Sequence, residues 1–396
     1  MIEKFVATHL SLAGKIKGYG FKRYLYASIN WRQRLIGIVG SRGVGKTTLM
    51  LQYYLENFNT PEDCLYISAD NVNTAAAGLF NLAEEFFNLG GKTLLIDEVH
   101  KYPNWQRELK NIYDSFPSKR VIFSGSSSIH ILRGKADLSR RAVYYNLSGL
   151  SFREFLNMRD AKSFKPLSFD EILKNHVKIA GSISADFPIL RRFKDYLKFG
   201  YYPFFNEGIE EFTAKLSNVV EKIFYEDIPL LFNVRPSTIH SLKKLFYLVA
   251  TSQPFTPNIS RISSQLGISK EYIYAYIDEL EKAGLFMLLY PKEKGFKLLR
   301  KPQKIYLECP SLFYLVEEEK GFLAEKGSVR EAFFVNQASH AVNLYSSQNA
   351  DFVDDKNRLF EIGGRNKKAS DCFIVSDDIN VGFKNKIPLW LFGFLY

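Results

Sequence analysis

One short motif restricts the possible folds of this chain more than any other feature. Residues 40–47 read Gly-Ser-Arg-Gly-Val-Gly-Lys-Thr, which matches the pattern G-x-x-x-x-G-K-[ST]. An apolar run at 35–39 precedes the motif, and a helix-like run at 48–55 follows it. In this strand–turn–helix context, backbone N–H groups can converge on phosphate oxygens at the positive end of a helix. The motif therefore predicts a phosphate-binding loop.

The residues of this loop have separate predicted roles. Lys46 is placed to reach the β- and γ-phosphates of a nucleotide, and Thr47 is placed to hold Mg²⁺. A purely structural glycine-rich turn is the alternative, and the flanking strand and helix argue against it. The set expected around the phosphates is Gly40, Ser41, Arg42, Gly43, Val44, Gly45, Lys46, Thr47 and Thr48.

A second motif supports chemistry at the same site. The apolar run at 94–96 ends in Asp97 and Glu98, so a buried strand would carry these two acids to its carboxyl end. There Asp97 can orient Mg²⁺ through its water shell, and Glu98 can accept a proton from an attacking water. This strand–acid–acid pattern is weak evidence for catalysis when it occurs alone. Because it follows a phosphate-binding loop here, it predicts hydrolysis.

Small hydroxyl groups follow the next predicted strand, at 120–124. Ser124 or Ser126 could sense a γ-phosphate or orient water, and the alternative is that the serines at 124–128 cap the following helix. Arg133, Arg140 and Arg141 come after these serines. One of them could neutralise charge on the γ-phosphate, from the same chain or from a neighbour, although a solvated arginine is the plainer interpretation.

The order of predicted elements indicates an α/β fold. A second buried strand is predicted at 63–70 and a fifth strand at 142–147, and helical runs alternate with the strands. This alternation predicts a parallel sheet with its ligand at the carboxyl ends of the strands. At 396 residues the chain exceeds one compact core. We expect an ATPase-type core at 1–150, a helical lid or linker at 151–230, a winged helix at 231–310 and a small α+β domain at 311–396.

The motifs at 40–48, 94–99, 124–128 and 147–155 together resemble the archaeal and bacterial AAA-type P-loop ATPases that carry a C-terminal domain of unknown function. The resemblance implies ATP and Mg²⁺ as ligands and ATP hydrolysis as the activity. Arg141 matches the arginine of the family's Gly-Arg pair, which implies a role at the γ-phosphate. The chain departs from the family pattern at Arg140, which replaces the glycine, and at Gly149, which replaces a proline.

A helix-turn-helix pattern predicts the winged helix in the middle of the chain. A helix at 259–266, a turn at Gly267 and a second helix at 270–283 precede two possible strands, at 285–290 and 304–307. The basic segment 292–301 would form the tip of the wing. From 230 to 310 the chain has twelve basic and six acidic residues, which favours contact with DNA. The second helix carries several acids, so a protein-binding or purely structural module is an equal alternative.

The C-terminal segment resembles the layout of PD-(D/E)xK nucleases. Asp351 and Glu361 match the two acids of that pattern, and Glu331 could be a helical acid. Gly363 stands at the lysine position, and Lys367 has the wrong spacing for the same strand face. We therefore expect a degenerate nuclease-like domain, and metal-dependent cleavage is the third functional alternative.

Composition restricts the cellular location and the partners that we expect for this protein. No apolar run approaches the ~20 residues of a membrane span, and the amino terminus lacks a signal pattern. The three cysteines form no metal-type pair, which fits a reducing cytoplasm. A net charge of +11 favours an anionic partner.

The leading hypothesis is a Mg²⁺-dependent ATPase that moves its domains and acts on DNA or a protein. The alternative is a nucleotide-dependent binding switch with little hydrolysis.

Overall fold

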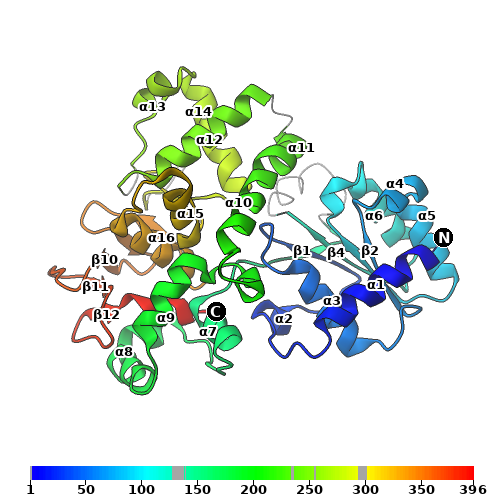
Figure 1. Cartoon of the computed structure of the whole chain (residues 1–396), viewed down its shortest axis with the longest axis horizontal. Coiled ribbons are helices and arrows are strands. Elements are labelled where there is room, and N and C mark those ends of the chain that lie inside the picture. Colours follow the sequence, from blue (N-terminus) through cyan, green and yellow to red (C-terminus); the bar gives the residue numbers. More distant parts are fainter. Residues whose placement is uncertain (1, 127–137, 139, 233–235, 254–255, 293–300) are drawn as a thin grey trace. The chain divides into compact units, whose positions relative to one another are not determined.

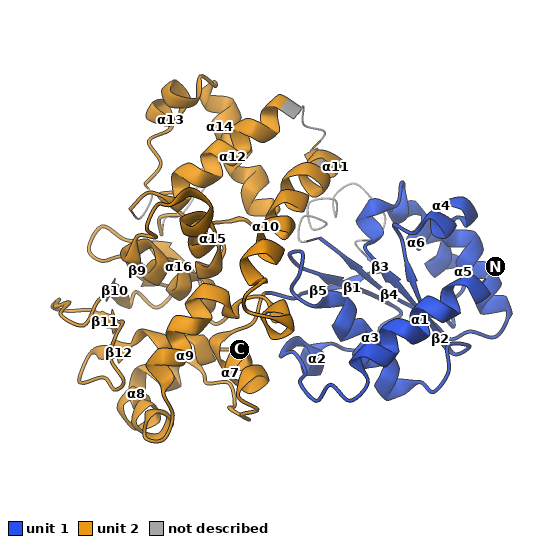
Figure 2. Cartoon of the chain, viewed as in Figure 1, with its two compact units in different colours: residues 1–148 blue, residues 149–396 orange. Residues whose placement is uncertain are grey.

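The chain forms two compact units. The computed structural model describes residues 2–126, 138, 140–232, 236–253, 256–292 and 301–396. Residues 1–148 form the first unit and residues 149–396 the second (Figure 2). The first boundary lies two residues from the predicted one at 150. The segments predicted as a lid, a winged helix and a C-terminal domain belong together to the second unit.

The first unit is built on a five-stranded parallel sheet, in the order β2-β3-β4-β1-β5 (Figure 1). This confirms the predicted α/β fold with a parallel sheet. The strands are β1 (Leu35–Val39), β2 (Cys64–Ser68), β3 (Thr93–Asp97), β4 (Arg120–Gly125) and β5 (Val143–Asn146). The helices are α1 (Glu3–Ile16), α2 (Leu25–Ser28), α3 (Lys46–Asn57), α4 (Val72–Ala77), α5 (Leu79–Asn88) and α6 (Trp105–Ser115).

The centre of the sheet is close-packed. Every residue of β1 is buried, as expected for a strand covered on both faces. A side chain at Gly37 in β1 would place its Cβ 2.7 Å from both Phe123 and Tyr144, so glycine is the residue that fits between these rings. The tight packing fixes the carboxyl end of β1, where the phosphate-binding loop begins.

Helix α1 protects the exposed edge of the sheet. The Tyr66 N–H, in the edge strand β2, donates to Nδ1 of His9 in α1 at 2.9 Å. His9 is fully buried, and desolvation lowers its pKa to about 4, so the imidazole remains neutral and can accept this bond. An outward N–H of the edge strand is thereby satisfied within the chain.

The second unit begins with a helical segment. Helix α7 starts with a reciprocal capping box between Ser151 and Glu154. The helices are α7 (Phe152–Arg159), α8 (Phe169–Ser184), α9 (Ile189–Asp195), α10 (Phe212–Lys222) and α11 (Ile228–Phe232). Wide π-type turns, Tyr196–Gly200 and Ile223–Asp227, continue α9 and α10.

Three helices and a hairpin follow, of which the last two helices and the hairpin have the order predicted from the sequence. They are α12 (Pro236–Ala250), α13 (Ile259–Leu266), α14 (Lys270–Lys282), β6 (Phe286–Leu289) and β7 (Lys304–Leu307). Gly267 ends α13 with φ 66°, and β6 and β7 pair antiparallel. Most of the predicted wing tip, 293–300, lies outside the described residues.

A mixed five-stranded sheet, in the order β12-β11-β10-β9-β8, completes the second unit. Its elements are α15 (Pro310–Lys320), α16 (Lys326–Ala338), β8 (Leu344–Ser346), β9 (Phe352–Asp354), β10 (Leu359–Gly363), β11 (Phe373–Ser376) and β12 (Lys386–Pro388). The β6–β7 hairpin is tied to this sheet, since the Ser346 N–H donates to the Tyr290 carbonyl at 2.9 Å and Lys292 Nζ donates to the Asp354 carbonyl at 2.6 Å. These bonds explain why the two predicted domains form one unit.

Among the described residues, no helix combines the length and the hydropathy that crossing a bilayer requires.

Candidate functional site

The phosphate-binding loop connects β1 to α3 at the carboxyl edge of the first sheet. Gly43 and Gly45 have φ values of 84° and 97°, a region that favours glycine. At Gly40 a Cβ atom would lie 2.2 Å from the Leu147 carbonyl oxygen, so any side chain would push the loop away from the end of β5. Helix α3 starts at Lys46, and no side chain caps its amino terminus. These features give the loop the form that its motif predicts.

Lys46 folds back over this loop. Its Nζ donates to the carbonyl oxygens of Gly40 and Ser41, at 2.9 and 3.0 Å, and the side chain is buried. Neutral carbonyls do not cancel the ammonium charge. Lys46 thus places its ammonium group beside a loop of N–H groups, which suits a phosphate anion.

The two residues predicted to hold Mg²⁺ are in direct contact. Thr47 Oγ1, in the first turn of α3, donates to Asp97 Oδ2 at 2.6 Å. Asp97 ends β3 and is buried, so its carboxylate is fixed beside the loop. A hydroxyl and a carboxylate oxygen at this edge are hard ligands of the kind that Mg²⁺ takes, so the residues present fit this ion.

Ser124 contacts both acids of the second motif. Its Oγ donates to Asp97 Oδ1 and accepts the Glu98 N–H at 3.0 Å, and the residue is fully buried. These bonds orient the acidic pair and leave Ser124 enclosed. Ser126 follows β4 and is also buried, while Ser127 and Ser128 lie outside the described residues.

Glu98 leaves the strand in a left-handed conformation, with φ 55°. The turn directs the chain away from β3, and the Glu98 side chain retains about a quarter of its exposure. Its Oε2 lies 3.5 Å from Nε2 of the buried His100. A partly exposed carboxylate one residue beyond Asp97 is where a base for an attacking water is expected.

Arg141 lies away from this edge. Strand β5 begins with Val143 beside Ile36 and ends with Asn146 beside Val39, so Arg141 precedes the strand at the amino edge. That edge is roughly 15 Å of strand length from the loop. The Arg141 guanidinium instead pairs with Asp114 through Nε and Nη2, at 2.8 and 3.0 Å. At this position the side chain does not meet a phosphate on the loop of its own chain. Arg133 lies outside the described residues.

Two residues support the site although the motifs do not include them. Arg23 precedes β1, and its Nη1 and Nη2 donate to the carbonyls of Val44 and Ser148 at 2.5 and 2.7 Å. Tyr66 in β2 donates its hydroxyl to Asp97 Oδ2 at 2.8 Å. The position of Tyr66 in a predicted strand could have indicated its contact with Asp97 from the sequence. The contact of Arg23 with the loop had no local signal in the sequence.

The C-terminal acids predicted from the nuclease pattern also come together, but around lysines. Lys304 Nζ lies 3.0 Å from Glu331 Oε2 and 3.4 Å from Asp351 Oδ1. Lys367 Nζ lies 2.6 Å from Glu361 Oε1. Within the described residues, no group of three His, Cys, Asp or Glu side chains has the geometry of a metal site.

Lys367 reaches Glu361 because the chain turns sharply after β10. A Cβ at Gly363 would lie 2.7–2.9 Å from the Lys367 stem, so that stem occupies the space above the glycine. The spacing along the chain had suggested that Lys367 could not share this face. The turn, closed by the bond from the Lys367 N–H to the Gly364 carbonyl at 3.0 Å, overrides that expectation.

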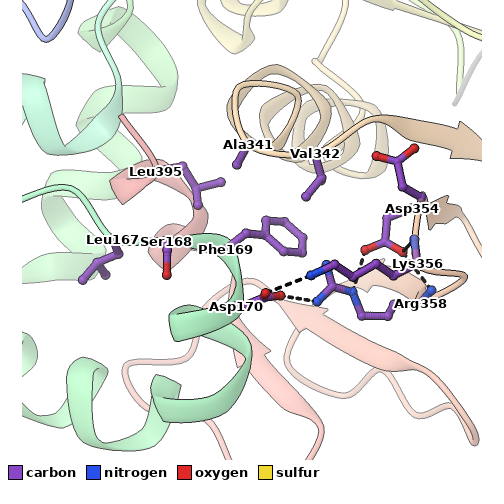
Figure 3. Close-up of a pocket in the computed structure, with 11 residues that line it drawn as sticks. Leu167, Ser168, Phe169, Asp170, Ala341, Val342, Asp354, Lys356, Arg358 and Leu395 are labelled. Atoms are coloured by element: carbon purple, nitrogen blue, oxygen red, sulfur yellow. Dashed lines mark hydrogen bonds and ion pairs between the residues drawn. The ribbon is translucent and has the colours of Figure 1, made fainter. Parts of the chain in front are cut away.

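A cavity of about 400 Å³ in the second unit offers no comparable chemistry (Figure 3). Asp170 in this cavity bonds to both Lys356 and Arg358, at 2.9 and 2.5 Å, and Arg358 also bonds to Asp354 at 2.6 Å. The hydrogen bonds from the Lys356 and Arg358 side chains lower the pKa of Asp170 to about 2. Four charged groups of this cavity, Asp170, Asp354, Lys356 and Arg358, are thus paired with one another.

Two parts of the chain match known protein families. Residues 32–156 match the AAA domain family. The AAA match covers the loop, both acids and all five strands of the first sheet. Residues 190–317 match a second family, described as a domain of unknown function (DUF8612). That match runs from α9 to the middle of α15 and includes the β6–β7 hairpin.

Two relatives share much of the chain. An uncharacterised protein of Methanocaldococcus jannaschii is 30% identical over 296 residues, which cover 71% of this chain and 62% of the relative. The match thus spans less than two thirds of that protein. An uncharacterised protein of Haemophilus influenzae is 25% identical over 344 residues, which cover 82% of this chain and 75% of the relative.

Solved structures are more distant. DnaA from Aquifex aeolicus, bound to AMPPCP, is 19% identical and has a TM-score of 0.27, with 69% of this chain and 88% of that chain covered. A Saccharomyces cerevisiae Hsp104–ADP complex is 12% identical and has a TM-score of 0.30, with 72% and 39% covered. These TM-scores are too low to support an inference about function.

Proposed function

We propose that the first unit binds ATP and hydrolyses it in a Mg²⁺-dependent reaction. One observation carries this proposal: the hydrogen bond between Thr47 and Asp97 joins the phosphate-binding loop to the acid-bearing strand. The match of residues 32–156 to the AAA domain family supports ATP as the nucleotide. Without the Thr47–Asp97 contact, the loop would indicate only that a phosphate binds.

The loop and Lys46 bind and orient the phosphates. The N–H groups between Gly40 and Thr47 and the start of α3 provide donors, and Lys46 exchanges its carbonyl partners for phosphate oxygens. Thr47 and Asp97 would hold Mg²⁺, which when bound neutralises charge on the phosphates. Arg23 keeps the loop in place through the Val44 carbonyl.

Glu98 is the proposed general base. Its backbone N–H is held by Ser124, so the carboxylate extends from a fixed point beside Asp97. In this role it accepts a proton from the water that attacks the γ-phosphate. Ser124 acts through Asp97 and Glu98, and we assign it a positioning role. Arg141 of a neighbouring copy is a further candidate for stabilising charge on the γ-phosphate.

Two substitutions and one control test the ATPase. Lys46→Ala removes the phosphate cation, and we expect it to abolish ATP binding and turnover. Glu98→Gln removes the base, and we expect ATP binding to persist while turnover falls by about 10²–10⁴-fold. Lys92→Ala is the matched control, because Lys92 is exposed and pairs only weakly with Asp63 at the surface. Phosphate release equal to wild type in both site variants would reject the proposal.

The same assay separates hydrolysis from a nucleotide switch. A binding switch predicts tight ATP binding with negligible phosphate release in the wild-type protein itself. The described residues supply both a metal acid and a candidate base, which favours hydrolysis. We also propose that this protein works in the cytoplasm. Its cysteines, Cys64, Cys309 and Cys372, are free, which fits a reducing compartment.

We propose that hydrolysis moves the second unit and that this unit acts on a protein. Its helices α12–α14 and the β6–β7 hairpin have the element order of a winged helix. On α14 the exposed positions include Glu271, Tyr272 and Asp278, and Tyr272 is 61% exposed. Acidic groups repel DNA phosphates, whereas an exposed tyrosine is typical of protein interfaces. A salt titration of duplex DNA binding tests this: tight binding that weakens steeply with salt would favour DNA instead.

A further inference from the structure

Tyr66 contacts the metal-site acid from a neighbouring strand. It pairs in register with Leu95, two residues before Asp97. Side chains two residues apart along a strand share a face, so Tyr66 and Asp97 lie on the same face of the sheet. The ring spans the diagonal between them, and its hydroxyl donates to Asp97 Oδ2 at 2.8 Å.

The hydrogen bonds of Asp97 nearly exhaust its acceptor capacity. A carboxylate offers about four lone-pair positions, two on each oxygen. On Oδ2, one accepts from Thr47 at 2.6 Å and the other from Tyr66. On Oδ1, one accepts from Ser124. Side chains of the described residues thus fill all but about one position, which lies on Oδ1.

Tyr66 is itself held rigidly. The residue is 5% exposed, and its backbone N–H bonds to His9 of α1. The ring is therefore fixed at its backbone by the bond to His9 and at its tip by the bond to Asp97.

We propose that the Tyr66 hydroxyl is a positioning group that fixes the Asp97 carboxylate and leaves it one acceptor position for the hydration shell of Mg²⁺. This inference rests on the proposed ATPase function. Removing the hydroxyl alone leaves the carboxylate held by Thr47 and Ser124 only, so the remaining acceptor position is less tightly fixed. Lys46 bonds to the Gly40 and Ser41 carbonyls and not to Asp97, so binding of nucleotide without metal is preserved.

ATP binding measured by calorimetry, in EDTA and over a range of Mg²⁺ concentrations, tests this role. We expect Tyr66→Phe to keep the EDTA affinity of the wild type within about twofold. We expect the Mg²⁺ concentration at half of the metal-dependent gain in affinity to rise by about tenfold, as for the loss of one charge-assisted hydrogen bond. Tyr53→Phe is the matched control, because this buried tyrosine bonds to Arg120 at the amino edge of the same sheet.

The outcomes distinguish the two proposals. If wild type binds ATP with a clear Mg²⁺ dependence and Tyr66→Phe shares its midpoint, the role of Tyr66 is overturned and the ATPase stands. A loss of affinity in EDTA for Tyr66→Phe also overturns that role, because it shows an effect on phosphate binding or on folding. If wild type binds no ATP under any condition, the ATPase proposal fails, and the role of Tyr66 fails with it.

Discussion

At the scale of single residues, the site depends on contacts between side chains that are far apart in the chain. Thr47 and Asp97 are 50 residues apart and share a hydrogen bond. Their identities follow from two sequence motifs, because phosphate binding and metal binding restrict residue type and spacing. Tyr66 and Arg23 could not be assigned in this way, since a strand tyrosine and a lone arginine have many possible partners.

Gly40 offers a residue-scale test of the loop. Gly40→Ala places a Cβ 2.2 Å from the backbone oxygen of Leu147, which cannot move away as a flexible side chain would. The loop must shift, at a cost of about 1–3 kcal/mol for such overpacking. We expect ATP affinity to fall by about tenfold or more, as measured by calorimetry. Gly14→Ala in α1 is the control, because among the described residues its added Cβ meets nothing within 4 Å apart from its neighbours in the same helix. Equal affinities for both variants would contradict the close contact.

At the scale of elements, the first sheet follows closely from its sequence and the second unit less so. Four strands of the first sheet, β1 to β4, are mostly buried apolar runs, which is a strong local signal, whereas β5 at the edge is only partly buried. The β6–β7 hairpin was predicted, but its attachment to β8 and β9 was not. That attachment consists of bonds such as the one from Ser346 to Tyr290, which depend on the three-dimensional path of the chain. The turn that brings Lys367 to Glu361 was missed for the same reason.

The contact between α1 and β2 predicts a pH dependence of stability. His9 has a folded-state pKa of about 4, below the ordinary value of 6.5, because burial disfavours its charged form. Its contribution to stability is therefore complete above pH 6.5 and is lost as the pH falls through 4. Protonation at Nδ1 would also turn the acceptor of the Tyr66 N–H into a donor.

Chemical denaturation between pH 7 and pH 4 measures this effect. We expect wild type to lose about 2–3 kcal/mol more unfolding free energy over this range than His9→Asn, whose amide oxygen can accept the same bond without titrating. The difference between the two proteins removes the shared effect of the carboxylates. Parallel pH profiles for wild type and His9→Asn would contradict a buried neutral His9.

At the scale of the whole molecule, the division into two compact units predicts independent responses to nucleotide. Each unit has its own sheet and its own buried core. A ligand that binds one folded unit stabilises that unit by mass action. The boundary between the units, after Ser148, follows the last strand of the parallel sheet.

Scanning calorimetry tests this expectation with the Glu98→Gln variant, which we expect to bind ATP without hydrolysing it. We expect two unfolding transitions, of which one rises by several degrees in ATP and Mg²⁺ while the other stays constant. At a ligand concentration of about 100 times Kd, the added stability is about 2.7 kcal/mol. Adding Lys46→Ala to this variant should remove the shift. A single transition, or an equal shift of both, would show that the units do not unfold separately.

The position of Arg23 has a mechanical consequence. The Arg23 guanidinium donates hydrogen bonds to the Val44 carbonyl in the loop and to the carbonyl of Ser148, which is the last residue of the first unit. One side chain thus connects the phosphate-binding loop to the residue at which the chain leaves the first unit. A shift of the Val44 carbonyl on phosphate binding would therefore also disturb the Arg23 bond to Ser148. A single side chain thus makes the geometry at the end of the first unit depend on the geometry of the phosphate-binding loop.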